Sequence, residues 1–189
     1  MKIFIRHMVS NRCKMLVKSE LQKLGLHFIL VELGEVEIME NITSEQRKLL
    51  QEGLFQSGLE LIEDHKSILI ERIKTIIIEM IHLNDEPPKT NFSHFLSQKL
   101  SHDYTYLANI FSESAGTTIE HYIINHKIER VKELLIYDEL NLTEISYRLN
   151  YSSVAHLSNQ FKKVTGLTPT FFKQLRANSR IPLENMWML

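Results

Sequence analysis

The sequence predicts an α+β protein in which a small sandwich of strands and helices precedes an all-helical region. Three observations carry this prediction. Up to about residue 62, apolar residues alternate between the spacing of strands and the spacing of helices. From Ser67 onward they recur only at intervals of three and four, the helical spacing. Within that second region, a group of four residues returns after 50 positions.

Residues 1–64 contain four strand patterns and two helical ones. The strands are KIFI, HFILVEL, VEIM and LELI, and the apolar run of HFILVEL predicts burial on both faces. Gly34 permits a tight turn between the second and third strands, and Thr43 with Gln46 has the spacing of a capping box at the second helix. The order β-α-β-β-α-β suits a ferredoxin-like sandwich of about 60 residues.

The helical region is predicted to extend over 65–177 and to be followed by a flexible tail, 178–189. The first helix, at about 66–83, should end at NDEPPKT because consecutive prolines remove donors and disfavour helix before them. The remaining helices are expected at about 91–100, 104–115, 118–136, 142–149, 153–165 and 169–176.

The repeat in this region predicts two copies of one supersecondary unit. Leu107, Asn109, Phe111 and Gly116 are matched, 50 positions later, by Leu157, Asn159, Phe161 and Gly166. The helix at 118–136 connects the copies; at 1.5 Å per residue it spans roughly 27 Å, close to the roughly 34 Å repeat of a DNA duplex.

The second copy has the pattern of two short helices joined by a sharp turn. Asn141 and Glu144 have capping-box spacing, and Asn150 tolerates the left-handed conformation that the turn requires. Ser152 or Ser153 is expected to cap the second helix, whose predicted buried residues are Leu157, Phe161 and Val164. The remaining outward residues of that helix are amide, hydroxyl, imidazole and cationic side chains: Val154, Ala155, His156, Ser158, Asn159, Lys162 and Lys163.

Such a braced helix fits a DNA major groove. Asn pairs bidentately with adenine, Val or Ala contacts a thymine methyl, and lysines neutralise phosphates. The stretch LTEISYRLNYSSVAHLSNQFKKVTGLTPTFF resembles the DNA-binding domain of the AraC family of bacterial transcription regulators. That family has a helix, a Gly-Phe-Ser-Ser turn, a recognition helix with Phe-Ser-x-x-Phe-Lys, and a Gly-x-[ST]-Pro end. Asn150, Tyr151 and Leu157 depart from its Gly, Phe and Phe.

The resemblance covers residues 66–176 and implies two helix-turn-helix units. It places base-reading residues at Thr105, Tyr106, Ala108 and Asn109 in the first unit and at Val154, Ala155, His156 and Asn159 in the second. Ser152 and Ser153 at the turn and Lys162 and Lys163 near the helix end complete the predicted DNA-binding set. In the first unit the turn is one residue shorter, and Ser112-Glu113-Ser114 replaces the usual basic pair.

Net charge gives little support to nucleic-acid binding. Residues 1–64 carry 8 Lys/Arg and 10 Asp/Glu, a net charge of −2, and residues 65–189 carry 14 and 13, a net charge of +1. Any electrostatic attraction to DNA must therefore come from local clusters. The single cysteine, the lack of a long apolar run and the absence of a signal-peptide pattern predict a cytoplasmic protein without a membrane partner.

The stretch MVSNRCKM, Met8 to Met15, is similar in placement to the Met-x-Cys-x-x-Cys loop of heavy-metal-associated domains. Those domains hold a soft metal ion between two thiolates. Here Ser10 stands at the first cysteine position, so Cys13 and Met8 are only weak candidates for a soft-metal site. Cys13 has three interpretations: an apolar packing residue, a metal ligand with Met8, His7 or a second chain, and a redox sensor.

These observations predict a sequence-specific DNA-binding regulator of transcription. We do not expect an enzyme, because the sequence has no Gly-rich phosphate loop, no His-Glu metal motif and no carboxylate pair typical of acid–base catalysis. Its expected partners are double-stranded DNA and the transcription machinery, with no cofactor. Homodimerisation through the sandwich or the helix at 66–83 is the plainer role for the extra domain. The alternative is a metal-binding or redox-sensing protein that acts through Cys13.

Overall fold

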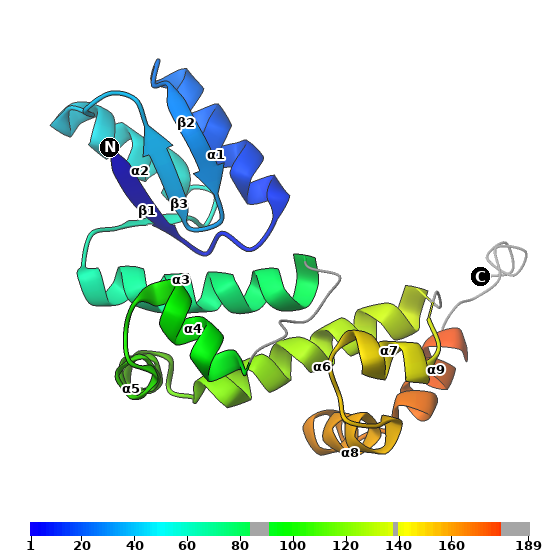
Figure 1. Ribbon diagram of the computed structural model, residues 1–189. Helices are drawn as coiled ribbons and strands as arrows, with labels where there is room; N and C mark the ends of the chain where they lie inside the picture. Colours follow the sequence, from blue (N-terminus) through cyan, green and yellow to red (C-terminus); the bar gives the residue numbers. More distant parts are fainter. Residues whose placement is uncertain (84–90, 138–139, 179–189) are drawn as a thin grey trace, which may run out of the picture. The chain divides into compact units, whose positions relative to one another are not determined.

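The computed structural model describes residues 1–83, 91–137 and 140–178, with the backbone alone for 176–178 (Figure 1). The described residues form two compact units. The first is drawn from Met1–Glu79 with Thr90–Gly116, and the second from Met80–Lys89 with Thr117–Leu189. Each of the two units contains one predicted helix-turn-helix, so each is described separately.

The sandwich has the predicted order of elements. These are β1 (Lys2–Arg6), α1 (Asn11–Lys23), β2 (Phe28–Glu32), β3 (Glu35–Ile38), α2 (Ser44–Phe55) and β4 (Glu60–Ile62). The sheet order is β2-β3-β1-β4 and all neighbouring strands are antiparallel. This is the strand order of a ferredoxin-like sandwich, which the β-α-β-β-α-β pattern predicted.

The core of the sandwich lies between the sheet and α1 and α2, which lie behind it in Figure 1. The strand register places Ile3 opposite Val36 and Ile5 opposite Leu61, so alternate residues of each strand point to one face. Ile3, Ile5 and Val36 are buried with Leu21 of α1 and Leu50 of α2. The predicted capping box of α2 is present, because Thr43 and Gln46 each accept a hydrogen bond from the other's backbone N–H.

The prediction that HFILVEL is buried on both faces was wrong. β2 is an edge strand, with Ile29 64% and Leu30 47% exposed, and a register shift between Phe28 and Leu30 interrupts its ladder. A continuous apolar run is typical of a central strand, but it does not reveal which strands become neighbours. Here only one side of β2 is paired, and only Val31 of the strand is fully buried.

The long helix after the sandwich consists of α3 (His65–Ile78) and a π-helical turn, η1 (Glu79–Leu83). Asp64 caps α3 by accepting a hydrogen bond from the Ser67 N–H at 2.7 Å. Glu71 of α3 is buried and faces the end of β1, where Arg6 Nε lies 3.7 Å from its carboxylate; Lys74 Nζ lies 2.7 Å from the same oxygen. The two cations compensate the buried charge, and the pair with Arg6 joins α3 to the end of β1.

Six more helices follow, within two residues of the predicted ranges. They are α4 (Phe92–Leu100), α5 (Tyr104–Ala115), α6 (Ile119–Tyr137), α7 (Leu142–Arg148), α8 (Val154–Thr165) and α9 (Pro169–Asn178). In the first unit α3, α4 and α5 pack on one another, and in the second α8 packs on α6, α7 and α9. The helix stop was predicted at NDEPPKT (84–90), which lies outside the described residues. Of the predicted flexible tail, 178–189, the structure describes only residue 178, at the end of α9. No helix in the described ranges has the length and apolarity needed to span a bilayer.

Candidate nucleic-acid interface

The second helix-turn-helix, α7 and α8, is organised by caps at both helix starts. Asn141 and Glu144 form the predicted capping box of α7. Ser153, rather than Ser152, caps α8 by accepting a hydrogen bond from the His156 N–H at 3.1 Å. α8 ends at Gly166, whose φ of +79° is the left-handed conformation that glycine adopts without strain.

The turn between these helices uses Asn150 in the left-handed conformation, with φ of +53°, as predicted. Directly after it, the Tyr151 N–H donates to the Ser146 carbonyl at 2.8 Å, and the Tyr151 ring is buried. Leu149 and Ile145 are buried beneath α8. The turn is therefore closed by a backbone hydrogen bond and a buried aromatic ring.

The outer face of α8 has the predicted residues. Ala155, His156, Asn159, Lys162 and Lys163 are exposed, and Val154 is half-buried, whereas Leu157 and Phe161 are fully buried. Val164, predicted to be buried, is 43% exposed. It lies three residues after Phe161, but α8 ends at the next residue, Thr165, so no further helical turn covers it.

The start of α8 is a small polar cluster. The Ser152 Oγ and His156 Nδ1 lie 3.0 Å apart, and the His156 ring meets the Tyr151 ring edge-on at 5.3 Å between centroids. Lys127 Nζ of α6 lies 5.0 Å from the centroid of the same Tyr151 ring. The ring therefore contacts both a half-buried cation and the imidazole of the exposed face.

Burial affects both partners of that cation–π contact. It lowers the pKa of the Lys127 ammonium and raises the pKa of the Tyr151 hydroxyl to about 12. Tyr151 Oη is buried and makes no hydrogen bond among the described residues. Because the Tyr151 hydroxyl has no partner, a phenyl ring would fill the same space equally well. The structure shows no stabilising contact of this hydroxyl in the turn.

The first helix-turn-helix, α4 and α5, has a shorter turn. Ser101 adopts the left-handed conformation, with φ of +56°, at the position that Asn150 takes in the second unit. Two residues later Asp103 caps α5 by accepting hydrogen bonds from the N–H groups of Thr105, at 2.8 Å, and Tyr106, at 3.3 Å. His102, between them, lies against the Tyr106 ring with centroids 5.6 Å apart.

The outer face of α5 is polar but has no cation. Thr105, Tyr106 and Asn109 are exposed and Ala108 is half-buried, while Leu107 and Phe111 are fully buried, as predicted. Near the helix end, Glu113 is exposed and its carboxylate lies 2.7 Å from Lys66 Nζ of α3. The predicted base-reading residues thus share one face in each unit, but the cations lie only on α8.

Two structural partners were not predicted. Lys127 of α6 contacts Tyr151 of the turn, 24 residues further along the chain. Lys66 of α3 pairs with Glu113 of α5, 47 residues further along. Neither lysine belongs to a motif, so the only available signal was the helical period of its own helix.

Cys13 lies in the first turn of α1, half-buried against the sandwich core. Burial alone would raise its pKa, but a hydrogen bond with Ser10, with Oγ and Sγ 3.6 Å apart, and backbone N–H groups hold the pKa below its ordinary value. Met8, the other weak metal candidate, is buried in the core, and the described residues contain no group of three His, Cys, Asp or Glu side chains placed to hold a metal ion. The apolar-packing interpretation of Cys13 agrees with these contacts.

Comparisons with known proteins match this geometry. Residues 96–175, from the end of α4 to α9, match the model of a family described as "Helix-turn-helix domain", of the AraC type. This part of the chain is therefore similar to an AraC-type helix-turn-helix domain. The C-terminal domain of AraT, a response regulator from Geobacillus stearothermophilus, is similar over 64% of this chain and 93% of that one, with a TM-score of 0.52 and 22% identity.

Bacterial regulators of greater length are also similar to this chain. An uncharacterised HTH-type transcriptional regulator from Staphylococcus aureus is 29% identical over 105 residues, 56% of this chain and 13% of that protein. YtdP and YdeC of Bacillus subtilis, described in the same words, are 23% identical over 163 residues and 22% identical over 145, or 76% and 77% of this chain. The chain spans 21% of the length of YtdP and 47% of YdeC.

Proposed function

We propose that this protein is a DNA-binding regulator of transcription whose α5 and α8 each enter a major groove and read base edges. The observation that carries the proposal is the pair of short helices, each capped at its start and braced from behind, that present Asn109 and Asn159 on their exposed faces. Fully buried Leu107, Phe111, Leu157 and Phe161 fix the rotation of the helices, so those faces point to solvent.

The chemistry of the exposed groups suits base recognition. An asparagine amide both donates and accepts, and pairs bidentately with the N6 and N7 edge of adenine. On α8, Val154 and Ala155 supply apolar contact for a thymine methyl, and Lys162 and Lys163 supply phosphate contacts. Thr105 and Tyr106 provide hydroxyl groups at the corresponding place on α5.

A solved relative supports this proposal. The DNA-binding domain of AdpA, described as a global transcriptional factor in complex with a target DNA, is similar over 58% of this chain and 95% of that one, with a TM-score of 0.50 and 16% identity. The similarity is one of fold.

We also propose that the chain has three functional parts: a ferredoxin-like module at 1–64, a DNA-binding region at 65–177 and a tail at 178–189.

The test is selection of bound sites from random duplex DNA with the full chain, followed by affinity measurements across a salt series. Wild type should recover a motif, and Asn109→Ala and Asn159→Ala should each relax one position and lower affinity for that motif by roughly 10- to 100-fold. Asn41→Ala, at an exposed residue of the sandwich, is the matched control and should leave the motif unchanged.

Two results would contradict the proposal. If both asparagine variants recover the wild-type motif with full discrimination, α5 and α8 do not read bases through those residues. If wild type shows salt-sensitive binding without any motif, the protein binds DNA only through phosphates.

A further inference from the structure

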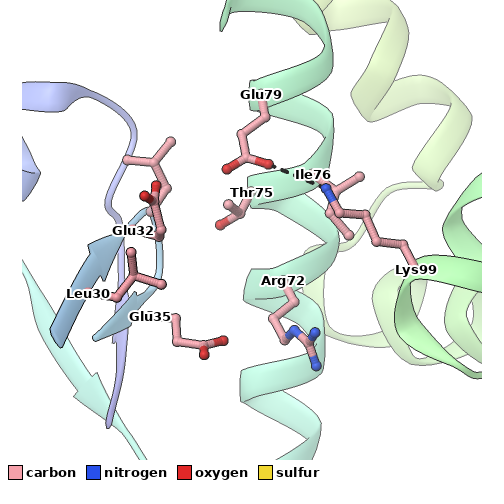
Figure 2. A pocket seen from close by; sticks show the side chains of 9 residues that line it. Leu30, Glu32, Glu35, Arg72, Thr75, Ile76, Glu79 and Lys99 are labelled. Atoms are coloured by element: carbon pink, nitrogen blue, oxygen red, sulfur yellow. Dashed lines mark ion pairs between the residues drawn. The ribbon is translucent and has the colours of Figure 1, made fainter. Parts of the chain in front are cut away.

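The first compact unit contains a cavity of about 220 Å³ between the β2–β3 hairpin and helices α3 and α4. Figure 2 shows its two walls: the hairpin with Leu30, Glu32 and Glu35, and the helices with Arg72, Thr75, Ile76, Glu79 and Lys99. By this measure about 10–15 Å³ holds one water molecule, so the cavity has room for a small metabolite.

The position of the hairpin wall is set by its backbone. Gly34, at the hairpin turn, has φ of +78°, and a Cβ built there would lie 3.1 Å from the Thr75 hydroxyl of α3. The turn lies close to α3 because Gly34 has no side chain. The cavity lies beside this close contact and is formed by the protein alone.

The charges of the two walls differ. The hairpin wall carries two carboxylates, Glu32 and Glu35, each paired with a lysine outside the cavity lining, Lys14 and Lys2. The helix wall carries the guanidinium of Arg72 and the ammonium of Lys99, which lies 3.7 Å from the Glu79 carboxylate, too far for a hydrogen bond.

Arg72 is an exposed cation of the helix wall. Within the described ranges it makes no ion pair and no side-chain hydrogen bond, although Glu35 extends from the opposite wall in Figure 2. A guanidinium presents a planar fork of donors that matches a carboxylate bidentately. Between the charged groups, Leu30 and Ile76 offer apolar surface.

We propose that this cavity binds a small molecule that carries both an ammonium group and a carboxylate, of the class of free amino acids. The carboxylate accepts hydrogen bonds from Arg72, the ammonium donates to Glu32 and Glu35, and an apolar side chain lies against Leu30 and Ile76. A ligand with both charges joins the two walls, whereas a simple anion would meet the hairpin carboxylates and a simple amine would leave Arg72 without a partner.

The consequence of occupancy rests on the proposed DNA-binding function. α3 packs on α5, and Lys66 of α3 pairs with Glu113 of α5, so the helix that forms one wall also supports the recognition helix. A ligand that fixes the hairpin on α3 thereby changes the freedom of the first helix-turn-helix. Its binding and the binding of DNA should be coupled reciprocally.

The test is calorimetric titration of the full chain, without DNA, with each standard amino acid and γ-aminobutyrate in turn. At least one probe should bind, and n-butylamine and butyrate should each bind at least tenfold more weakly. Arg72→Gln should weaken the successful probe by roughly tenfold or more, because a charge-assisted pair is lost. Arg12→Gln, an exposed arginine of α1, is the matched control and should bind as wild type does.

Absence of heat and of thermal stabilisation with every probe at 10 mM would overturn the proposal. Binding of n-butylamine with the affinity of the best amino acid, or unchanged binding by Arg72→Gln, would also overturn it, because the cavity would then be a simple cation site. Since these titrations contain no DNA, their outcome is independent of whether α5 and α8 read bases. With a bound probe, an unchanged affinity for the selected duplex would overturn only the coupling.

Discussion

The two helix-turn-helix units form their turns with different residues. In α7–α8, Asn150 takes the left-handed position, the buried Tyr151 ring fills the turn and Ser153 caps the next helix. In α4–α5, Ser101 takes the left-handed position and Asp103 follows two residues later as the cap, so the turn has one residue fewer and no buried tyrosine.

The same two units also differ in charge. α8 ends with exposed Lys162 and Lys163, while α5 has no lysine or arginine and its Glu113 pairs with Lys66 of α3. The repeat therefore preserves the buried positions of the second helix of each unit, while the charge of its exposed face changes. Under the proposed function we therefore expect α8 to supply most of the electrostatic affinity for DNA, and α5 to contribute mainly through its neutral polar face.

The largest expected effect concerns this charge difference. Removing Lys162 and Lys163 together, by Lys→Ala changes, should lower affinity for the selected duplex by roughly 10- to 100-fold at 0.1 M salt and reduce the slope of log affinity against log salt by about 2. Fluorescence anisotropy across a salt series measures both quantities. Arg12→Ala with Lys48→Ala removes the same charge from exposed positions of the sandwich and should leave the slope unchanged.

The converse change tests whether α5 lacks only a cation. Glu113→Lys should steepen the same slope by about 1, since one phosphate contact is added. An unchanged slope would mean that the end of α5 lies away from the phosphate backbone.

Much of this comparison was predictable from the sequence, because it depends on local spacing. The capping boxes at Thr43 and Asn141 and the left-handed Asn150 are set by residues at most three apart. The exposure of Leu30 and Val164, and the contacts of Lys127 and Lys66, were not predictable. They depend on which elements become neighbours, and a period along one helix or strand does not contain that information.

The second effect isolates the tyrosine that only the longer turn has. Burial raises the pKa of Tyr151 to about 12, above the value of about 10 in an unfolded chain. The folded state thus has its full stability below pH 10 and loses it as pH rises toward 12, by roughly 2–3 kcal/mol in total. Tyr151→Phe should remove this part of the loss and, at pH 7, stabilise the protein by up to about 1 kcal/mol, because a buried hydroxyl without a partner is eliminated.

Urea unfolding of wild type and Tyr151→Phe from pH 7 to pH 11.5 measures that difference. Tyr147→Phe, at a tyrosine that is 84% exposed on α7, is the matched control and should follow the wild-type curve. Parallel curves for wild type and Tyr151→Phe would show that Tyr151 ionises as readily in the folded protein as in the unfolded one.

The third effect compares the two caps. Asp103→Ala should cost about 1–2 kcal/mol, because a charged carboxylate that accepts two backbone N–H bonds at a helix N-terminus is removed. Ser153→Ala should cost about 0.5–1 kcal/mol, because its hydroxyl accepts one such bond. Urea unfolding measures both, and Asp103→Asn should recover most of the loss. Equal costs for the two alanine variants would show that the second bond and the negative charge of Asp103 add nothing.

The smallest effect concerns the left-handed residues themselves. Serine has a Cβ and is less tolerant of positive φ than asparagine, whereas glycine adopts it freely. Ser101→Gly should therefore stabilise the protein by about 0.5 kcal/mol, after the entropy that glycine loses on folding is subtracted, and Asn150→Gly should gain less. Thermal unfolding of both variants ranks the two turns. Ser114→Gly, at an exposed position of α5, is the control and should destabilise the protein by about 0.5 kcal/mol. If Asn150→Gly gained more than Ser101→Gly, the longer turn, despite its buried ring and its asparagine, would be the more strained of the two.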